Sequence, residues 1–310
     1  MKHIYGPVPS RRLGISLGVD LVPKKICTYD CIYCQIGGTT LQTVERKAYI
    51  PARSILRDVK EALQEWGDKV DYVAISGSGE PTLNHAIGEV IHGIKKLAPT
   101  PVAVITNSSL MHLEEVRQAL LQADVIMPSL DAATMSVFHT INRPHQSLEI
   151  EQIIQGLTAL RKEYKGQIWL EILLCRGVND GGEEIEGFRQ AIHTIRPDKV
   201  HLNTVVRPAV EDYASALPRD RMEQVRASLG EDAEIIAEFE GHTQVIPSDD
   251  LEQKIIRTIQ RRPETPEDLA KALGLHDLEI VKILDKLAKE GRITYRVFNQ
   301  RLYYEVAKGT

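Results

Sequence analysis

The stretch VDYVAISGSGEPTL, residues 70–83, joins a run of apolar residues to a turn that contains glycines at positions 77 and 79. Residues 70–76 have the pattern of a strand buried on both faces, which is typical of a parallel sheet covered by helices. In such folds the functional groups lie at the carboxyl ends of the strands. Residues 77–83 are therefore a candidate site.

The same pattern repeats along the chain. Amphipathic helical periods alternate with apolar strands at 101–106, 123–130, 167–174, 199–205 and 233–239. We therefore predict an α/β fold in which residues 1–245 form a partial (β/α)6 TIM-like barrel of parallel strands.

The pattern changes near residue 250. Segments 251–262, 266–274 and 278–291 have the periodicity of amphipathic helices, with a tight turn around Gly274 and Leu275. Residues 293–306 then alternate as a hairpin that turns at Asn299 and Gln300. We predict a small winged helix-turn-helix domain over residues 250–310.

Composition limits the classes of function. The chain has 310 residues with a net charge of −5, so any contact with nucleic acid must be local. No apolar run is long enough to span a bilayer, and no signal-peptide core is visible near the N-terminus. We expect a cytoplasmic protein with no membrane partner.

Cysteines cluster in ICTYDCIYC, residues 26–34, and Cys175 is the fourth cysteine of the chain. A structural zinc ion needs four ligands, and this cluster supplies Cys27, Cys31 and Cys34. A disulfide is not favoured in a reducing compartment. An iron–sulfur cubane held by three cysteines would leave one iron open to a small molecule.

The spacing C-x3-C-x2-C, with an aromatic residue before the last cysteine, resembles the radical S-adenosylmethionine (SAM) superfamily. The resemblance implies a [4Fe–4S] cluster on Cys27, Cys31 and Cys34, and an external flavodoxin- or ferredoxin-like electron donor. The reduced cluster would cleave SAM and release a 5′-deoxyadenosyl radical that abstracts hydrogen. The glycines and polar residues at the ends of the strands would then bind SAM, and Tyr33 would lie against the adenine. They are Gly77, Gly79, Glu80, Asn107, Ser129, Asp131 and Asn203.

Two further segments, PVPSRRLGISLGVDLVP and DAATMSVFHTINRPH, resemble iron–sulfur oxidoreductases related to wyosine-base enzymes. Wyosine synthases carry additional cysteines for a second cluster. Outside residues 26–34 this chain has one cysteine, Cys175, which cannot hold a second cluster by itself. We therefore do not transfer their reaction, and we interpret Cys175 as a buried small hydrophobe.

Arg12, Arg143 and His145 are the candidates for catalysis on the substrate side, together with Arg11 and Asn142. Arginines bind carboxylates or phosphates through paired hydrogen bonds, and a salt-bridged loop that anchors the barrel is an equal alternative. Glu171 would point into the barrel if its neighbours in the strand point outward.

Three functions remain open. The first is an enzyme that modifies RNA presented by the winged helix, whose wing combines Arg296 and Arg301 with aromatic residues able to stack on bases. The second is an enzyme for a peptide or small metabolite, with the winged helix as a peptide-binding or dimerising module. The third is an iron–sulfur regulator that binds DNA. Because every SAM motif precedes residue 205, we expect SAM cleavage not to depend on the C-terminal segment.

Overall fold

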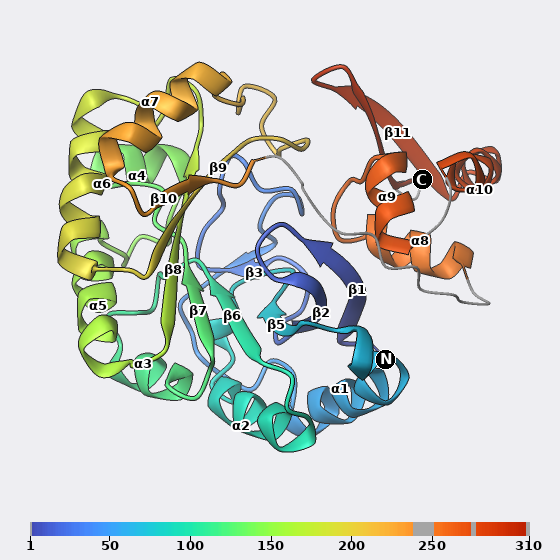
Figure 1. Cartoon of the computed structure of the whole chain (residues 1–310), viewed down its shortest axis with the longest axis horizontal. Coiled ribbons are helices and arrows are strands. Elements are labelled where there is room, and N and C mark those ends of the chain that lie inside the picture. Colours follow the sequence, from blue (N-terminus) through green and yellow to red (C-terminus); the bar gives the residue numbers. More distant parts are fainter. Residues whose placement is uncertain (1, 238–250, 274–276, 308–310) are drawn as a thin grey trace.

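A curved sheet dominates the computed structural model, which describes residues 2–237, 251–273 and 277–307 (Figure 1). Its eight strands lie in the order β1-β2-β5-β6-β7-β8-β9-β10. Every neighbouring pair is parallel except β1 and β2, which are antiparallel. The strands are β1 (Ile4–Ser10), β2 (Gly14–Asp20), β5 (Tyr72–Ser76), β6 (Val102–Thr106), β7 (Val125–Pro128), β8 (Gln167–Leu174), β9 (Lys199–Thr204) and β10 (Ala233–Ile235).

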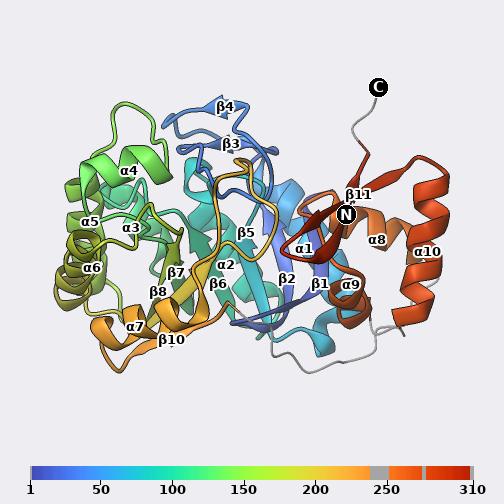
Figure 2. The same cartoon turned by 90° about the horizontal axis from the view of Figure 1, so that it is seen from above.

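Helices cover the outer face of this sheet (Figure 1). They are α1 (Ala52–Trp66), α2 (Ile87–Leu97), α3 (Glu114–Leu120), α4 (Met135–Ile141), α5 (Ile150–Glu163), α6 (Gly182–Ile195) and α7 (Arg219–Leu229). The short strands β3 (Ile26–Cys27) and β4 (Leu41–Gln42) pair with each other beside one end of the barrel (Figure 2).

Alternating side chains give the sheet two apolar faces. Val73 and Ile75 of β5 belong to the large core under the helices, whereas Ala74 belongs to a separate cluster with Ala103 and Met127. Successive residues of a strand point to opposite faces, so this second cluster faces the inside of the barrel. Small residues inside a curved sheet leave room for a cavity.

The six predicted strands correspond to β5 through β10, and the parallel α/β architecture is confirmed. The prediction omitted β1 and β2, which add two strands at one edge of the sheet. β1 has the sequence IYGPVPS, whose glycine and prolines suggest a loop. It is an edge strand, where proline is tolerated because one side of the strand needs no partner.

The C-terminal segment contains α8 (Leu251–Ile259), α9 (Pro266–Leu273), α10 (Asp277–Lys289) and the hairpin β11 (Ile293–Phe298) and β12 (Arg301–Val306). It has its own core, and α8 and α9 pack against β1 (Figures 1 and 2). The hairpin turns at Asn299 and Gln300, as predicted. The elements occur in the expected order, and the winged-helix assignment stays a prediction.

The expected boundary between residues 245 and 250, and the turn at Gly274 and Leu275, lie outside the described residues. Within the described residues, no helix has both the length and the apolar character that a membrane crossing requires.

Candidate active site

Three cysteine sulfurs face one cavity and each accepts a hydrogen bond from a different part of the chain. Lys25 Nζ donates to Cys34 Sγ at 3.1 Å, and Asn142 Nδ2 donates to Cys31 Sγ at 3.4 Å. Cys27 Sγ accepts from Asn107 Nδ2 at 3.6 Å. Such donors stabilise negative charge on sulfur, so the loop is equipped to present thiolates.

Burial shifts the pKa of two of these thiols. It raises the pKa of Cys27 to about 12 and raises the pKa of Cys31 well above its usual value. Metal binding would displace these protons, because thiolates are the ligating form. Among residues 2–237, 251–273 and 277–307, no three His, Cys, Asp or Glu side chains are grouped to hold a single metal ion. The three cysteines of a cubane bind separate irons, so their sulfurs need not converge on one point.

The glycine-rich loop after β5 packs directly on the cysteine loop. A Cβ atom at Gly79 would lie 2.0 Å from the carbonyl oxygen of Ile26, and the Glu80 amide donates to that same oxygen at 3.2 Å. Gly77 has a φ of +148° and also lines the cavity. Both glycines are predicted SAM contacts, and at Gly79 the close approach that glycine permits is to the chain itself.

Glu80 is 1% exposed and accepts hydrogen bonds on both carboxylate oxygens. Thr82 and Thr106 donate to Oε1, while Oε2 accepts the Asn107 amide at 2.8 Å. Burial raises the pKa of Glu80, which these hydrogen bonds oppose. Oε2 therefore keeps capacity for a further donor, and Glu80 lines the cavity.

Of the predicted SAM-binding residues that follow β6 and β7, some line the cavity and one does not. Asn107 and Ser129 line the cavity, as does the ring of Tyr33. Asp131 is not among the lining residues, and its oxygens accept hydrogen bonds from Tyr33, Asn142 and the Leu173 amide. These contacts hold the cysteine loop against β8, and no cavity-lining position supports the predicted SAM-binding role of Asp131.

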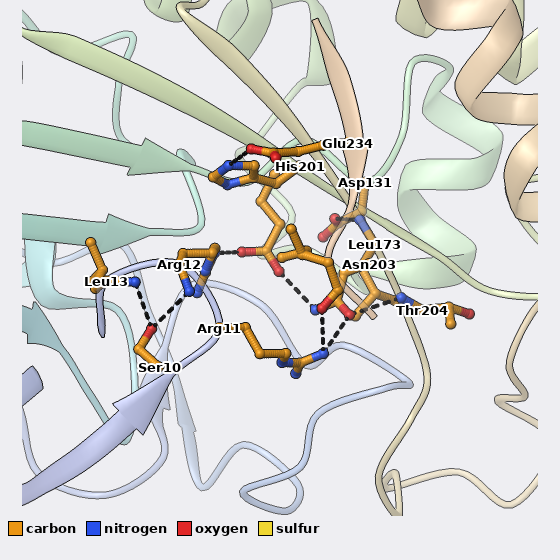
Figure 3. A network of polar contacts seen from close by, with 12 residues as sticks. Ser10, Arg11, Arg12, Leu13, Asp131, Leu173, His201, Asn203, Thr204 and Glu234 are labelled. Atoms are coloured by element: carbon orange, nitrogen blue, oxygen red, sulfur yellow. Dashed lines mark hydrogen bonds and ion pairs between the residues drawn. The ribbon is translucent and has the colours of Figure 1, made fainter. Parts of the chain in front are cut away.

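A polar network crosses the inside of the barrel (Figure 3). Arg12, from the turn between β1 and β2, forms an ion pair with Glu171 of β8. Asn203 of β9 donates to Glu171 Oε1 at 3.0 Å, and its Oδ1 accepts from Arg11 at 3.1 Å. The prediction that Glu171 points inward is confirmed, because it lines the cavity while Leu170 and Ile172 are in the outer cores.

Arg11 also donates to the carbonyl oxygens of Ile236 and Ala237, each at 3.1 Å. These carbonyls follow β10, whereas Arg11 follows β1. The side chain therefore joins the two edges of the open sheet. Paired donors and a permanent charge suit arginine to this bridging position.

Arg143 and His145 do not line the cavity. Arg143 forms an ion pair with Glu211, with its NH1 2.6 Å from Oε1, and its NH2 donates to the Tyr213 hydroxyl at 2.8 Å. His145 Nδ1 lies 2.9 Å from Ser147 Oγ. These contacts correspond to the alternative of an anchoring loop, and the predicted catalytic role of both residues lacks geometric support.

The C-terminal segment contributes side chains that sequence analysis did not assign to the site. Arg261 forms an ion pair with Asp20, and its guanidinium carbon lies 3.5 Å from the centre of the Tyr5 ring. Asp20 Oδ1 also accepts the amide of Ser78, in the glycine-rich loop, at 2.9 Å. The glycine-rich loop is therefore connected to this segment through Asp20, and the expectation that SAM cleavage does not depend on the segment stays a prediction.

The cavity has a volume of about 460 Å³ and lies between the barrel and the C-terminal helices. Its lining is rich in cations and includes few carboxylates. The basic residues are Arg11, Arg12, Lys25, Arg207, Lys254, Arg257, Arg261 and Arg262, and the acidic residues are Glu80, Glu171 and Glu264. No single sequence motif signals this set, because it is assembled from the turn after β1, the loop after β9 and the C-terminal helices.

An open parallel barrel with three unpaired cysteines at the carboxyl ends of its strands defines the class of iron–sulfur enzymes that activate a small molecule at an open iron. Residues 21–191 match the family model described as the radical SAM superfamily. The chain belongs to this superfamily and is a radical SAM enzyme, whose cofactors are a [4Fe–4S] cluster and SAM.

Several known proteins are similar over most of this chain. The UPF0026 protein MJ1312 of Methanocaldococcus jannaschii is 30% identical over 310 residues, which cover 98% of this chain and 96% of that protein. A protein named GTPase Obg from Brachyspira hyodysenteriae is 34% identical over 98% of this chain, which spans 45% of that protein.

Among solved structures, a radical SAM methyltransferase from Sphaerobacter thermophilus superposes with a TM-score of 0.55 at 17% identity. The match covers 71% of this chain and 66% of that one. At this identity the likeness concerns the fold alone.

Proposed function

We propose that Cys27, Cys31 and Cys34 hold the [4Fe–4S] cluster and that the enzyme abstracts a hydrogen atom from RNA. When bound and reduced by a flavodoxin- or ferredoxin-like donor, the cluster supplies the electron that cleaves SAM into methionine and a 5′-deoxyadenosyl radical. One observation carries the proposal: the three cysteines, the glycine-rich loop and a set of basic side chains all line the same cavity.

The chain's own residues would position SAM. Glu80 Oε2 has capacity to accept from the α-ammonium group, and Gly77 exposes backbone beside it. Tyr33 presents its ring to the cavity while its hydroxyl donates to Asp131, which fixes the ring's orientation for stacking on adenine. Asn107, Ser129 and Asn203 supply polar groups at the remaining strand ends.

The basic lining favours RNA over a neutral peptide or metabolite, because a phosphodiester carries negative charge wherever it enters. The hairpin β11–β12 exposes fewer aromatic side chains for stacking on RNA bases than its sequence indicated. Phe298 packs against the barrel core, and the Tyr303 hydroxyl donates to the Val206 carbonyl at 2.8 Å, so both turn inward. Tyr295, 59% exposed, remains available for stacking. The peptide or metabolite alternative keeps the same cavity, with the winged helix as a binding or dimerising module.

The test is anaerobic incubation of reconstituted, dithionite-reduced protein with SAM and bulk RNA. We expect 5′-deoxyadenosine and a mass change in nuclease-digested RNA, and neither with Cys31→Ala. RNA of unchanged mass, with 5′-deoxyadenosine still formed, would reject RNA and leave the peptide or metabolite alternative. Absence of 5′-deoxyadenosine from cluster-loaded protein would reject the assignment of the cavity to SAM.

A further inference from the structure

Three guanidinium groups from separate segments meet where the barrel adjoins the C-terminal helices. We call Arg11, Arg207 and Arg262 the arginine cluster. Arg11 follows β1, Arg207 lies in the loop after β9, and Arg262 follows α8. All three line the cavity. Burial, and then the charges of Arg207 and Arg262, lower the pKa of Arg11 to about 10. Like charges are thus close enough to act on one another.

The carboxylates beside the cluster do not balance it. Glu264 accepts from both Arg207 and Arg262, at 3.0 Å and 2.7 Å, and Asp268 lies 3.3 Å from Arg207. Within residues 2–237, 251–273 and 277–307, the Arg11 side chain donates to an amide oxygen and two carbonyl oxygens and forms no ion pair with a carboxylate.

Two arginines that line the cavity have hydrogen-bond donors that the described residues leave unsatisfied. Arg207 is 9% exposed, and its Nε is buried and has no hydrogen-bond partner among the residues that the structure describes. Such a group carries a desolvation cost unless a ligand satisfies it. Arg257, which also lines the cavity, has neither an ion pair nor a hydrogen bond within the described part of the chain. The molecule as a whole has a net charge of −5, so this concentration of cations is local.

We propose that the arginine cluster binds a phosphate group of the substrate, and that Arg257, which lines the same cavity, supplies a further contact to it. A phosphate offers several oxygens in a tetrahedron and can accept from more than one planar guanidinium at once, which suits a site assembled from separate segments. The proposal rests on the proposed function only in taking this cavity as the substrate site. The same phosphate could belong to an RNA nucleotide or to a small phosphorylated metabolite.

This placement gives the C-terminal segment a role in the active site. The arginine cluster and the three cysteines line one cavity of about 460 Å³, which the substrate would share with the [4Fe–4S] cluster and SAM, so a small part of the substrate rather than a folded RNA would enter it. A phosphate held at the cluster would leave the rest of the substrate directed along the cavity toward the cysteines. Arg262 would then select the substrate although it lies in the C-terminal segment.

The experiment measures binding to the full-length, cluster-loaded protein, saturated with SAM so that the SAM carboxylate cannot be the anion detected. The probes are uridine 5′-monophosphate, uridine and a single-stranded RNA decamer, with calorimetry and fluorescence anisotropy as readouts. We expect at least one phosphorylated probe to bind about tenfold more tightly than uridine. Binding of the mononucleotide indicates a small substrate, and binding of the decamer alone indicates RNA.

The main variants are Arg257→Gln, which alters an exposed side chain, and Arg207→Lys, which keeps the charge but loses the planar fork. Both variants should bind the phosphorylated probe about tenfold more weakly than the wild type does, whereas their affinity for uridine should not change. For the decamer, each lost phosphate contact should lower the slope of log K against log salt by about 0.7. The control is Arg189→Gln on α6, an exposed arginine paired with Glu186, which should bind as the wild type does.

Equal binding of uridine and both phosphorylated probes would overturn the proposal, as would equal weakening by Arg189→Gln and Arg257→Gln. Circular dichroism establishes that each variant is folded. Binding needs no radical chemistry, so this test is separate from the test of the proposed function. Phosphate-dependent binding together with unchanged RNA mass would reject RNA as the substrate of the reaction and would still support the phosphate site.

Discussion

Arg261 joins the C-terminal segment to the glycine-rich loop through Asp20, and the energy of this connection is measurable. Arg261 NH1 lies 3.0 Å from Asp20 Oδ1, and the two side chains are 19% and 13% exposed. Breaking a fully buried pair costs about 3–5 kcal/mol, and residual exposure reduces this to roughly 2 kcal/mol. Loss of the contact with Tyr5 adds about 0.5–1 kcal/mol.

We therefore expect Arg261→Gln to lower the free energy of unfolding by roughly 2–3 kcal/mol. Asp20→Asn should lower it by roughly 2 kcal/mol, because the asparagine oxygen can still accept the Ser78 amide. The double variant should lose less than the sum, with a coupling energy of about 1.5 kcal/mol. Urea unfolding of the wild type and the three variants gives all of these values.

The exposed variant Arg189→Gln is the control and should change stability by less than about 0.5 kcal/mol. Additivity of the two single changes within about 0.5 kcal/mol would refute the reasoning, because it would mean that Arg261 and Asp20 do not interact. SAM binding should also weaken in Arg261→Gln, since Asp20 holds Ser78 in the loop. Unchanged SAM affinity would limit the connection to stability.

Three further predictions follow from single contacts. Cys31→Ala should lose the iron measured by chemical assay after anaerobic reconstitution, whereas Cys175→Ala, which alters a buried cysteine outside the cavity, should retain it. Gly79→Ala should impair cluster loading and stability together, because its Cβ would lie 2.0 Å from the Ile26 carbonyl oxygen; wild-type iron content would contradict this. Burial lowers the pKa of His201 to about 4 from an unfolded value near 6.5, so the unfolded state takes up the proton first as the pH falls. His201 should thus contribute stability above pH 6.5 and lose up to about 3 kcal/mol between pH 6.5 and 4, a loss absent from His201→Gln in urea titrations.

Local patterns were sufficient to predict most of the barrel. The runs of Val, Ile and Leu at 70–76 and 101–106 locate β5 and β6, because strands covered on both faces need apolar residues throughout. Alternation within β8 placed Glu171 inside the barrel, since successive side chains of a strand point to opposite faces. The cysteine spacing indicated the superfamily because Cys27, Cys31 and Cys34 lie within one short loop, so their pattern is visible along the chain.

The sequence by itself determined the parallel architecture, the cysteine loop and the glycine-rich turn, because each depends on residues that are close along the chain. Only the tertiary structure decided what surrounds them. Arg261 reaches Asp20 across 241 positions, and Arg207 and Arg262 share Glu264 although a strand and two helices separate them. Such pairs leave no periodic signal, because they form only when the open edge of the sheet at β1 is covered by the C-terminal helices. The sequence thus specified the cysteine loop and the glycine-rich turn that line the cavity, and the packing of that edge specified the basic side chains that line it with them.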